Sequence, residues 1–255
     1  MPSSYAHHRF GRELLPALPP DVRQCVQRFR RMYDLGLQGP DFFFYYNPYF
    51  KTTIGDLGKV YHRKTGLEFF PAACAAATSE AAKAYLYGLL GHYCLDSICH
   101  PFVNRLVSIG EARHVPLESE LERFFLLSDG ETAPESYDIS KRFRLTRGEY
   151  MTVAAFYPPA TGGAVSWAVK NMAFSLRFLA SPKRKRNVAL LQKVKPSLIE
   201  HMIPAQDNPD LAPYVQELAE LYGSALSQYP VLLAQLLAHQ KNGQPLGEEF
   251  SPNFG

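Results

Sequence analysis

The sequence has no run of apolar residues that approaches the length of a membrane-spanning helix, and its first residues lack the apolar core of a secretory signal peptide. We therefore expect a cytoplasmic protein. Cysteine is scarce, because only four occur among 255 residues and no two form a CxxC pair. This scarcity disfavours a disulfide scaffold and a cysteine-based zinc site, so we expect small buried cysteines in a reducing compartment. They are Cys25, Cys74, Cys94 and Cys99.

The sequence also lacks internal repeats, low-complexity segments and any sustained alternation of polar and apolar residues, so no strand is predicted. Helical patterns fill the chain instead, and a hydrophobic fraction of 46% can form a substantial core. We predict an all-α multi-helix bundle that forms one domain over 1–255. A helical buttress at 148–240 would comprise helices at about 148–157, 163–180 and 209–240. The polar tail at 242–255 is expected to wrap loosely or fray.

The strongest early helix pattern begins after Ser79, which is a good N-cap residue. Gly88 and Gly91 interrupt this pattern. Glycine inside a helix costs about 1 kcal/mol relative to alanine, so the pair indicates close approach by another segment. Pro101 disfavours helical angles at the residue before it, which predicts a kink or break there. Pro230 should likewise kink or split the last helix.

Charge is unevenly distributed along the chain, although the net charge is only +3. Residues 141–200 carry 12 Lys and Arg side chains against two acidic ones, and the run from Lys183 to Arg186 is entirely basic. Such a block could meet an anionic phosphate surface, a lipid headgroup or nucleic acid. A solvated turn between two helices explains the same run equally well.

Histidines and acids recur four residues apart in the middle of the chain. His92, Asp96 and His100 fall on one face of a helix, within about 80° of each other. His114 and Glu118 repeat the spacing downstream. Imidazole nitrogen and carboxylate oxygen are zinc ligands, and a divalent cation offsets the cost of gathering such groups under apolar cover. We interpret these residues as metal ligands. The alternative is that they decorate polar helix faces.

Further candidate ligands lie upstream. His7 or His8 precedes the first predicted helix, a Gly-Pro turn delivers Asp41, and His62 stands alone. The aromatic run at 42–46 fits a buried loop or the wall of a pocket. Taken singly, these residues could belong to a flexible terminus, an Asx-type turn and a polar surface. Together with the downstream set they are too many for one tetrahedral zinc, whereas three zinc ions that share bridging carboxylates would use them economically.

In their order along the chain, these motifs resemble those of the zinc-dependent phospholipase C family, with the single-strand-specific zinc nucleases as more distant relatives. The residues that carry the resemblance are HHRFG near the start, GPDFFF, the lone His62, GHYCLDSICHP and HVPLE. They cover roughly the first 130 residues and keep the family's order of ligands. The resemblance implies an all-helical bundle that encloses a trinuclear zinc site, with metal ligands within 1–130.

The resemblance also implies how the ligands divide among the zinc ions, of which there would be three and at minimum two. One ion would be held by Asp41, His62, His92 and Asp96, and a second by His100, His114 and Glu118. The third would share Asp96 and take His7 together with the amino and carbonyl groups of the first residue, Met1 or, after its removal, Pro2. His8 is then free to face solvent. Asp41 would additionally act as the catalytic general base.

The function predicted on this basis is zinc-dependent phosphodiester hydrolysis. The specific reaction predicted is phospholipase C-like cleavage of glycerophospholipids by zinc-activated water, which gives diacylglycerol and a phosphorylated headgroup. The partners would be a phospholipid or other phosphodiester substrate and, transiently, a membrane surface, with no obligate protein partner. Two alternatives stay open. One is a single-strand-specific zinc nuclease or 3'-nucleotidase that acts on nucleic acid, and the other is a non-catalytic, zinc-stabilised helical binding protein.

Overall fold

The structure, a computed structural model, describes residues 4–47, 50–181, 183–194 and 196–255. Within these ranges the fold is all-α, as predicted, and contains no β-strand. The α-helices are α1 (Ser4–Leu14), α2 (Pro20–Arg28), α3 (Arg30–Gly36), α4 (Leu57–His62), α5 (Gly66–Ala76), α6 (Glu80–Ser108), α7 (His114–Ser128), α8 (Arg147–Ala154), α9 (Gly162–Leu179), α10 (Arg184–Val194) and α11 (Ala212–Asn242). The 3-10 helices are η1 (Leu15–Ala17), η2 (Gly39–Tyr45), η3 (Pro134–Ser136), η4 (Ser140–Arg142), η5 (Pro196–His201) and η6 (Glu248–Phe250). In these described ranges every helix is too short or too polar to span a bilayer.

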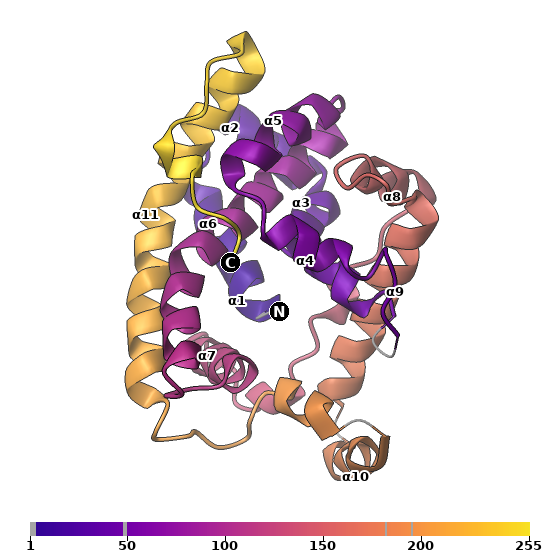
Figure 1. Cartoon of the computed structure of the whole chain (residues 1–255), viewed down its shortest axis with the longest axis vertical. Coiled ribbons are helices and arrows are strands. Elements are labelled where there is room, and N and C mark those ends of the chain that lie inside the picture. Colours follow the sequence, from indigo (N-terminus) through magenta and orange to yellow (C-terminus); the bar gives the residue numbers. More distant parts are fainter. Residues whose placement is uncertain (1–3, 48–49, 182, 195) are drawn as a thin grey trace.

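Helix α6 is the central element of the bundle, with α11 along one side and α8 and α9 on the far side of α4 (Figure 1). Helices α3 and α11 pack along it, and α1, α2 and α5 also contact it. The crossing with α3 is close because glycines face each other there. A Cβ at Gly88 would lie 2.2 Å from the Tyr33 carbonyl oxygen, and one at Gly36 would lie 2.2 Å from that of Tyr85. The close approach predicted from Gly88 and Gly91 is thereby confirmed.

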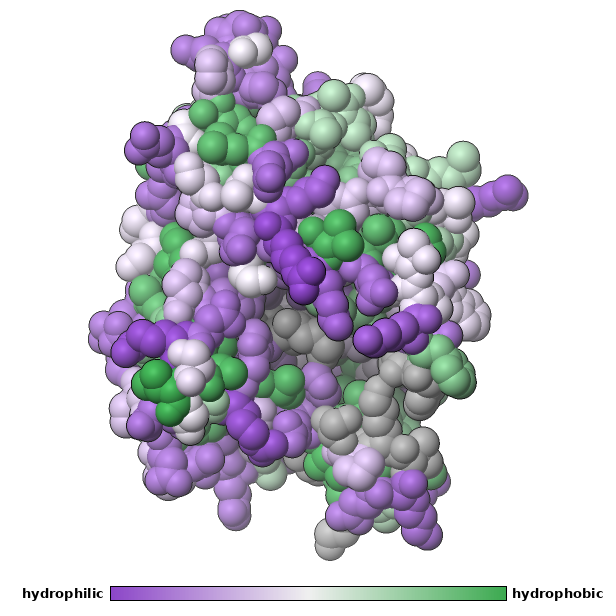
Figure 2. All heavy atoms as spheres, in the orientation of Figure 1, coloured by the Kyte–Doolittle hydropathy of each residue, from purple (hydrophilic) through white to green (hydrophobic). Residues whose placement is uncertain are grey.

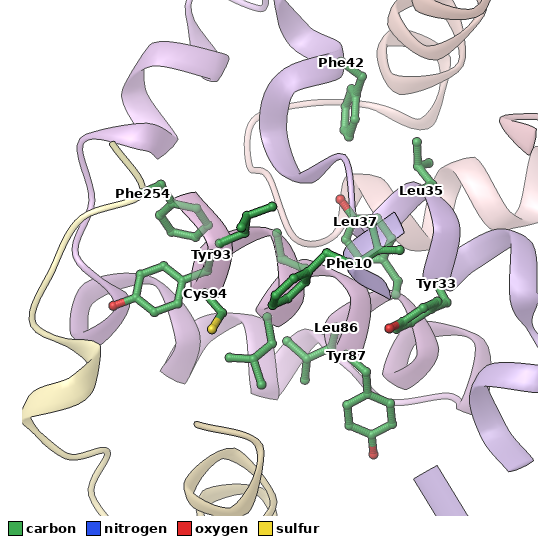
Figure 3. Close-up of a cluster of buried hydrophobic side chains, with 14 of the residues drawn as sticks. Phe10, Tyr33, Leu35, Leu37, Phe42, Leu86, Tyr87, Tyr93, Cys94 and Phe254 are labelled. Atoms are coloured by element: carbon green, nitrogen blue, oxygen red, sulfur yellow. The ribbon is translucent and has the colours of Figure 1, made fainter. Parts of the chain in front are cut away.

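Buried aromatic side chains surround α6 (Figure 3). Phe10 of α1 and Tyr33 of α3 have no exposed surface, and the Tyr33 hydroxyl donates to the Gly11 carbonyl oxygen at 3.0 Å. Tyr93 of α6 packs edge-on against Phe254, with ring centroids 4.9 Å apart. Because closely packed interiors leave side chains and helices little room to shift, this core fixes the orientation of the functional residues on α6.

Of the kinks or breaks predicted at two prolines, the breaks do not occur. Helix α6 continues through Pro101, and α11 continues through Pro230. Each proline removes one backbone hydrogen bond, but neighbouring residues such as Val103 and Tyr229 are buried in the core. Tertiary packing of the flanking turns therefore keeps both helices continuous. At the start of α6 the predicted cap is confirmed, since the Ser79 side chain accepts a hydrogen bond from the Ala82 amide.

The basic run that begins at Lys183 leads into α10, a helix that the sequence analysis did not predict. The interpretation of this run as a solvated turn is therefore wrong. Hydrophilic side chains gather over α10 in the space-filling view (Figure 2). Asn187 holds the helix to the end of α9, because its side-chain amide donates to the Phe178 carbonyl oxygen at 2.9 Å.

The tail after α11 is packed, so the prediction that it frays is wrong. Phe250 and Phe254 have no exposed surface. The Phe254 amide donates to the His62 carbonyl oxygen at 3.1 Å, and the Gly66 amide donates to that of Pro252 at 3.0 Å. The segment thus returns to the bundle beside α4 and α6 (Figure 1). Two phenylalanines four residues apart were the available signal in an otherwise polar stretch.

Helix α1 is tied to the end of α7 by Asp129. The Asp129 carboxylate accepts hydrogen bonds from Arg9 Nε at 3.1 Å, from the Tyr5 hydroxyl and from the Arg12 guanidinium. Burial opposes its ionisation, but the Tyr5 hydroxyl and the two guanidiniums outweigh it and hold the pKa of Asp129 below its ordinary value. Because α1 carries candidate ligands, the hydrogen bonds to Asp129 help to position the site.

We expect Asp129→Asn to lower the free energy of unfolding by about 1–2 kcal/mol at pH 7, through weaker hydrogen bonds to the two arginines. The pKa of Asp129 is depressed in the folded chain. Its contribution is therefore complete above the unfolded pKa of about 3.9 and disappears as the pH falls through the folded pKa. Thermal unfolding at pH 7 and at pH 3 measures this. Glu131→Gln, at an exposed acid two residues away, is the matched control. A difference that did not change with pH would contradict the ionic origin.

Candidate metal centre

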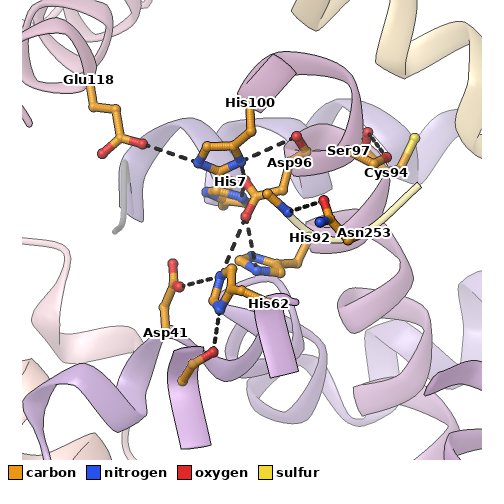
Figure 4. Close-up of polar contacts among 12 residues, drawn as sticks. His7, Asp41, His62, His92, Cys94, Asp96, Ser97, His100, Glu118 and Asn253 are labelled. Carbon is orange, nitrogen blue, oxygen red and sulfur yellow. Dashed lines mark hydrogen bonds and ion pairs between the residues drawn. The ribbon is translucent and has the colours of Figure 1, made fainter. Parts of the chain in front are cut away.

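The helical spacing of the central motif places three candidate ligands on one face of α6, as predicted (Figure 4). Asp96 lies between its two histidines. Its Oδ2 is 3.2 Å from His92 Nε2, and its Oδ1 is 3.6 Å from His100 Nδ1. All three residues are buried, and His92 has no exposed surface. The four-residue spacing on α6 therefore brings two imidazoles and one carboxylate together on one face of the helix.

Helix α1 adds His7 to this face. His7 Nε2 lies 3.0 Å from Asp96 Oδ1, and the His7 ring stacks on that of His92 with centroids 4.6 Å apart. His8 points elsewhere, with its Nδ1 3.6 Å from an oxygen of Asp34. The structure thus brings His7 to the cluster, in agreement with the choice of His7 over His8. The expectation that His8 faces solvent is wrong, because His8 is only 3% exposed.

The segment η2 delivers Asp41 to the same cluster. Gly39 makes this approach possible, since its φ is +50° and a Cβ there would lie 2.1 Å from the His92 ring. Asp41 Oδ1 lies 3.0 Å from His62 Nε2. The His62 Nδ1–H donates to the Gly58 carbonyl oxygen at 2.6 Å, which leaves Nε2 directed at the cluster. The second and third predicted ligands along the chain therefore meet across two different helices.

The last two candidates come from α7, where they meet His100. His114 is the first residue of α7, so Glu118 follows one turn later on the same face. His114 Nε2 lies 2.9 Å from Glu118 Oε1, and His100 Nε2 lies 3.7 Å from the same oxygen. His100 Nδ1–H donates to the Asp96 carbonyl oxygen at 3.2 Å, which directs its Nε2 towards Glu118. These three residues therefore form a second cluster of two imidazoles and one carboxylate.

Three groups of residues in the described chain place their ligand atoms close enough to hold a metal ion. They are His7, His92 and Asp96; Asp41, His62 and His92; and His100, His114 and Glu118. All eight residues predicted from the sequence occur in these groups. The division resembles the one implied by the family resemblance, although His92 here belongs to two groups. Their role as ligands stays a prediction, and the predicted ligand at Met1 or Pro2 lies outside the described residues.

The charge of the cluster favours cations. Among the described residues, none of the three carboxylates lies within 4 Å of a lysine or arginine nitrogen, and only histidines pair with them. Burial opposes their ionisation, but nearby positive charge, that of the imidazoles included, lowers the pKa of Asp41 to about 2 and that of Asp96 well below its usual range. Nearby positive charge, that of His100 and His114 included, likewise lowers the pKa of Glu118. Two buried carboxylates and one half-buried carboxylate without a lysine or arginine partner in the described chain can be compensated by a bound cation.

The protonation and hydrogen bonding of the histidines also fit a zinc site. Burial lowers the pKa of His92 to about 4, so this imidazole is neutral and able to donate a lone pair. His62 Nε2 and His92 Nε2 lie 3.0 Å and 3.2 Å from carboxylate oxygens of Asp41 and Asp96, but neither these nitrogens nor Asp41 Oδ1 and His92 Nδ1 make a hydrogen bond of good geometry among the described residues. Burial opposes protonation of His100 too, but Asp96 and Glu118 raise its pKa to about 9. Buried imidazole nitrogens and carboxylate oxygens that face one another without a hydrogen bond of good geometry match the ligand chemistry of zinc.

A pocket of about 180 Å³ opens onto the cluster. Its lining includes His62, His100 and His114 together with Phe44, Lys59, Arg63, Asn104 and Gly255. Some of these residues were not predicted from the sequence, among them the two cations, Lys59 in α4 and Arg63 at its C-terminal end, and the tail residue Gly255. A Cβ at Gly255 would lie 2.3 Å from His100 Nδ1, so the end of the described chain touches the site.

The protein is thus an all-α chain in which five imidazoles and three carboxylates, all of them residue types that can hold a metal ion, meet beneath an open pocket. Residues 6–163, more than half of the chain, match the family described as zinc dependent phospholipase C. The chain belongs to this family, which is a family of zinc hydrolases. The match spans all eight candidate residues. No curated protein and no solved structure matches the chain.

Proposed function

We propose that this protein is a zinc-dependent phospholipase C that cleaves glycerophospholipids into diacylglycerol and a phosphorylated headgroup. The observation that carries the proposal is a set of three carboxylates, of which Asp41 and Asp96 are buried and Glu118 is half-buried. In the described chain they lack a lysine or arginine partner and converge with five histidines at the base of a pocket. Membership of the family supports the chemistry, and the pocket supports access by a substrate.

The residues divide into sites for up to three zinc ions. Asp41, His62 and His92 would hold one, with Asp96 close by; His100, His114 and Glu118 would hold a second; and His7 with Asp96 would hold a third. When bound, zinc supplies Lewis-acid stabilisation of phosphate charge and lowers the pKa of a water molecule towards neutrality. Asp96 presents its two oxygens to different histidines, His7 on one side and His92 on the other, which suits a bridging carboxylate.

Asp41 is the residue we assign to proton transfer. Its pKa of about 2 keeps it ionised near neutral pH. A base this weak can take up the water proton because a bound zinc would also lower the pKa of the water. In the proposed step a water oxygen forms a bond to phosphorus, the bond from phosphorus to the glycerol oxygen breaks, and the water proton passes to Asp41. Asp41 then passes this proton to the leaving glycerol oxygen and is ionised again, so the products are diacylglycerol and the phosphorylated headgroup. His62 holds Asp41 in position at 3.0 Å.

The walls of the pocket suit an anionic, amphipathic substrate. Lys59 and Arg63 are exposed at its edge and can attract a phosphodiester before it reaches the buried acids. Phe44 lines the same pocket and offers an apolar surface next to them. A phosphodiester with an apolar group attached on one side therefore fits the lining better than a small inorganic anion.

We expect the zinc-loaded protein to hydrolyse a chromogenic phosphocholine diester and a choline phospholipid, and to lose both activities on chelation. The measurement is product release together with zinc content by elemental analysis. Degradation of single-stranded DNA without hydrolysis of either diester would replace the proposal with the nuclease alternative. About one zinc per chain, melting on chelation and no diesterase activity at high protein concentration would instead indicate a structural metal site.

A further inference from the structure

Helix α9 exposes aromatic and basic side chains on one continuous stripe. Buried positions such as Val165 and Met172 face the bundle, while the exposed positions follow the heptad-like spacing of four, three, four and three residues. The exposed residues are Gly163, Trp167, Lys170, Phe174 and Arg177. Trp167 is 58% exposed and Phe174 is 71% exposed. An outward-facing helix surface normally carries small or charged residues, so two large aromatic rings there need an explanation.

The charge along α9 has one sign. Helix α9 contains no aspartate or glutamate, and residues 150–199 contain eight lysines and arginines without a single acidic residue. Lys170 and Arg177 alternate with the aromatic rings along the helix. Met151 of α8 extends the apolar part, since it is 61% exposed and its side chain packs against Gly162. Aromatic rings between cations are the composition of a helix face that lies in a membrane interface.

The stripe is joined directly to the candidate metal centre. Trp167 Nε1 donates to the Tyr46 carbonyl oxygen at 2.9 Å, and the Asn171 side-chain amide donates to the same oxygen at 3.4 Å. Tyr46 immediately follows η2, the element that carries Asp41 and the pocket residue Phe44. Binding of the stripe to a lipid surface would therefore also hold this wall of the pocket close to the lipid.

We propose that the stripe of Trp167, Lys170, Phe174 and Arg177, with Met151 beside it, docks the protein on an anionic phospholipid surface and delivers the pocket to its substrate. The choice of lipid as the occupant rests on the proposed phospholipase function and on the charge complementarity described above. The aromatic rings enter the headgroup region, and the two cations pair with lipid phosphates. The family match ends at residue 163, where the stripe begins, so nothing in the match assigns this surface.

Trp167 is the only tryptophan of the chain, so its fluorescence reports directly on the stripe. We expect vesicles of phosphatidylcholine mixed with phosphatidylglycerol to shift its emission to the blue and to sediment the protein, and phosphatidylcholine alone to do so weakly. Phe174→Ser keeps the reporter and the Tyr46 contact, and should weaken sedimentation about tenfold. Lys170→Gln with Arg177→Gln should weaken it about fivefold per charge on the anionic vesicles.

Two controls separate this inference from the proposed function. Val231→Ser, at an apolar residue of α11 that is 44% exposed, should bind vesicles like the unmodified protein. Phe174→Ser should hydrolyse the soluble chromogenic diester at the unmodified rate while losing activity on vesicles. Vesicle binding without diester hydrolysis would reject the phospholipase and retain the docking surface.

Unchanged vesicle binding by the Phe174 and Lys170/Arg177 variants would overturn the docking surface and leave the metal centre unaffected. Binding of a single-stranded oligonucleotide, or a concentration-dependent dimer, that shields Trp167 while vesicles do not shift its emission would also overturn the inference in favour of that occupant.

Discussion

Replacing Asp96 with asparagine should remove two equivalents of zinc at once and lower kcat/KM for the phosphocholine diester by about a thousandfold or more. The reason is the position of the carboxylate. Oδ1 lies 3.0 Å from His7 Nε2, and Oδ2 lies 3.2 Å from His92 Nε2 and 3.8 Å from His62 Nε2. An amide offers only one neutral oxygen in place of two charged ones, so both adjoining metal groups are weakened. Elemental analysis and initial rates measure the two effects on the same sample.

The matched control is Asp34→Asn. Asp34 is also a buried aspartate, at 3% exposure, but it pairs with Arg30 Nε at 2.7 Å and belongs to none of the metal groups. We expect this variant to keep its zinc and its activity, with a loss of stability alone. Loss of a single zinc equivalent in Asp96→Asn would refute the bridging assignment. Equal zinc loss in both variants would point to a general loss of folding.

The parts of the site that depend on helical geometry alone could be predicted from the sequence. Spacing of four residues predicts that His92, Asp96 and His100 converge, and the structure confirms it because α6 is continuous through them. The pair His114 and Glu118 follows from the same rule. These local relations need only a helix, so no knowledge of the tertiary fold was required to predict them.

Convergence between different elements could not be predicted from spacing. Asp41 reaches His62 because the backbone at Gly39 has positive φ and lies against the His92 ring, a contact that no local pattern encodes. The resemblance to a family placed these residues together where residue-by-residue physics left a turn and a surface histidine as alternatives. His7 entered the cluster in the same way, through the packing of α1 on α6.

The errors share one physical cause, which is that packing outweighed local preference. Pro101 disfavours a helix at His100, yet α6 continues to Ser108 because core residues flank the proline on both sides. The tail has polar composition, but Phe250 and Phe254 have no exposed surface and bring the chain back to the site. Composition averages over a segment, whereas two well-placed side chains decide whether it packs.

The second large effect concerns Asp41, whose proposed role as general base can be separated from metal binding. Asp41→Asn should lower kcat by about 10²–10⁴-fold with little change in KM, since proton transfer belongs to the chemical step.

His62→Gln is the matched comparison, because His62 belongs to the same metal group and lies 3.0 Å from Asp41 but carries no carboxylate. Both variants should lose at most one zinc equivalent, and excess zinc should bring them to equal occupancy. At equal zinc content Asp41→Asn should remain slower than His62→Gln by about a hundredfold, because the second variant retains the Asp41 carboxylate to which we assign the water proton. Equal rates under those conditions would show that Asp41 acts through the metal alone, and the assigned proton acceptor would have to be sought elsewhere in the pocket.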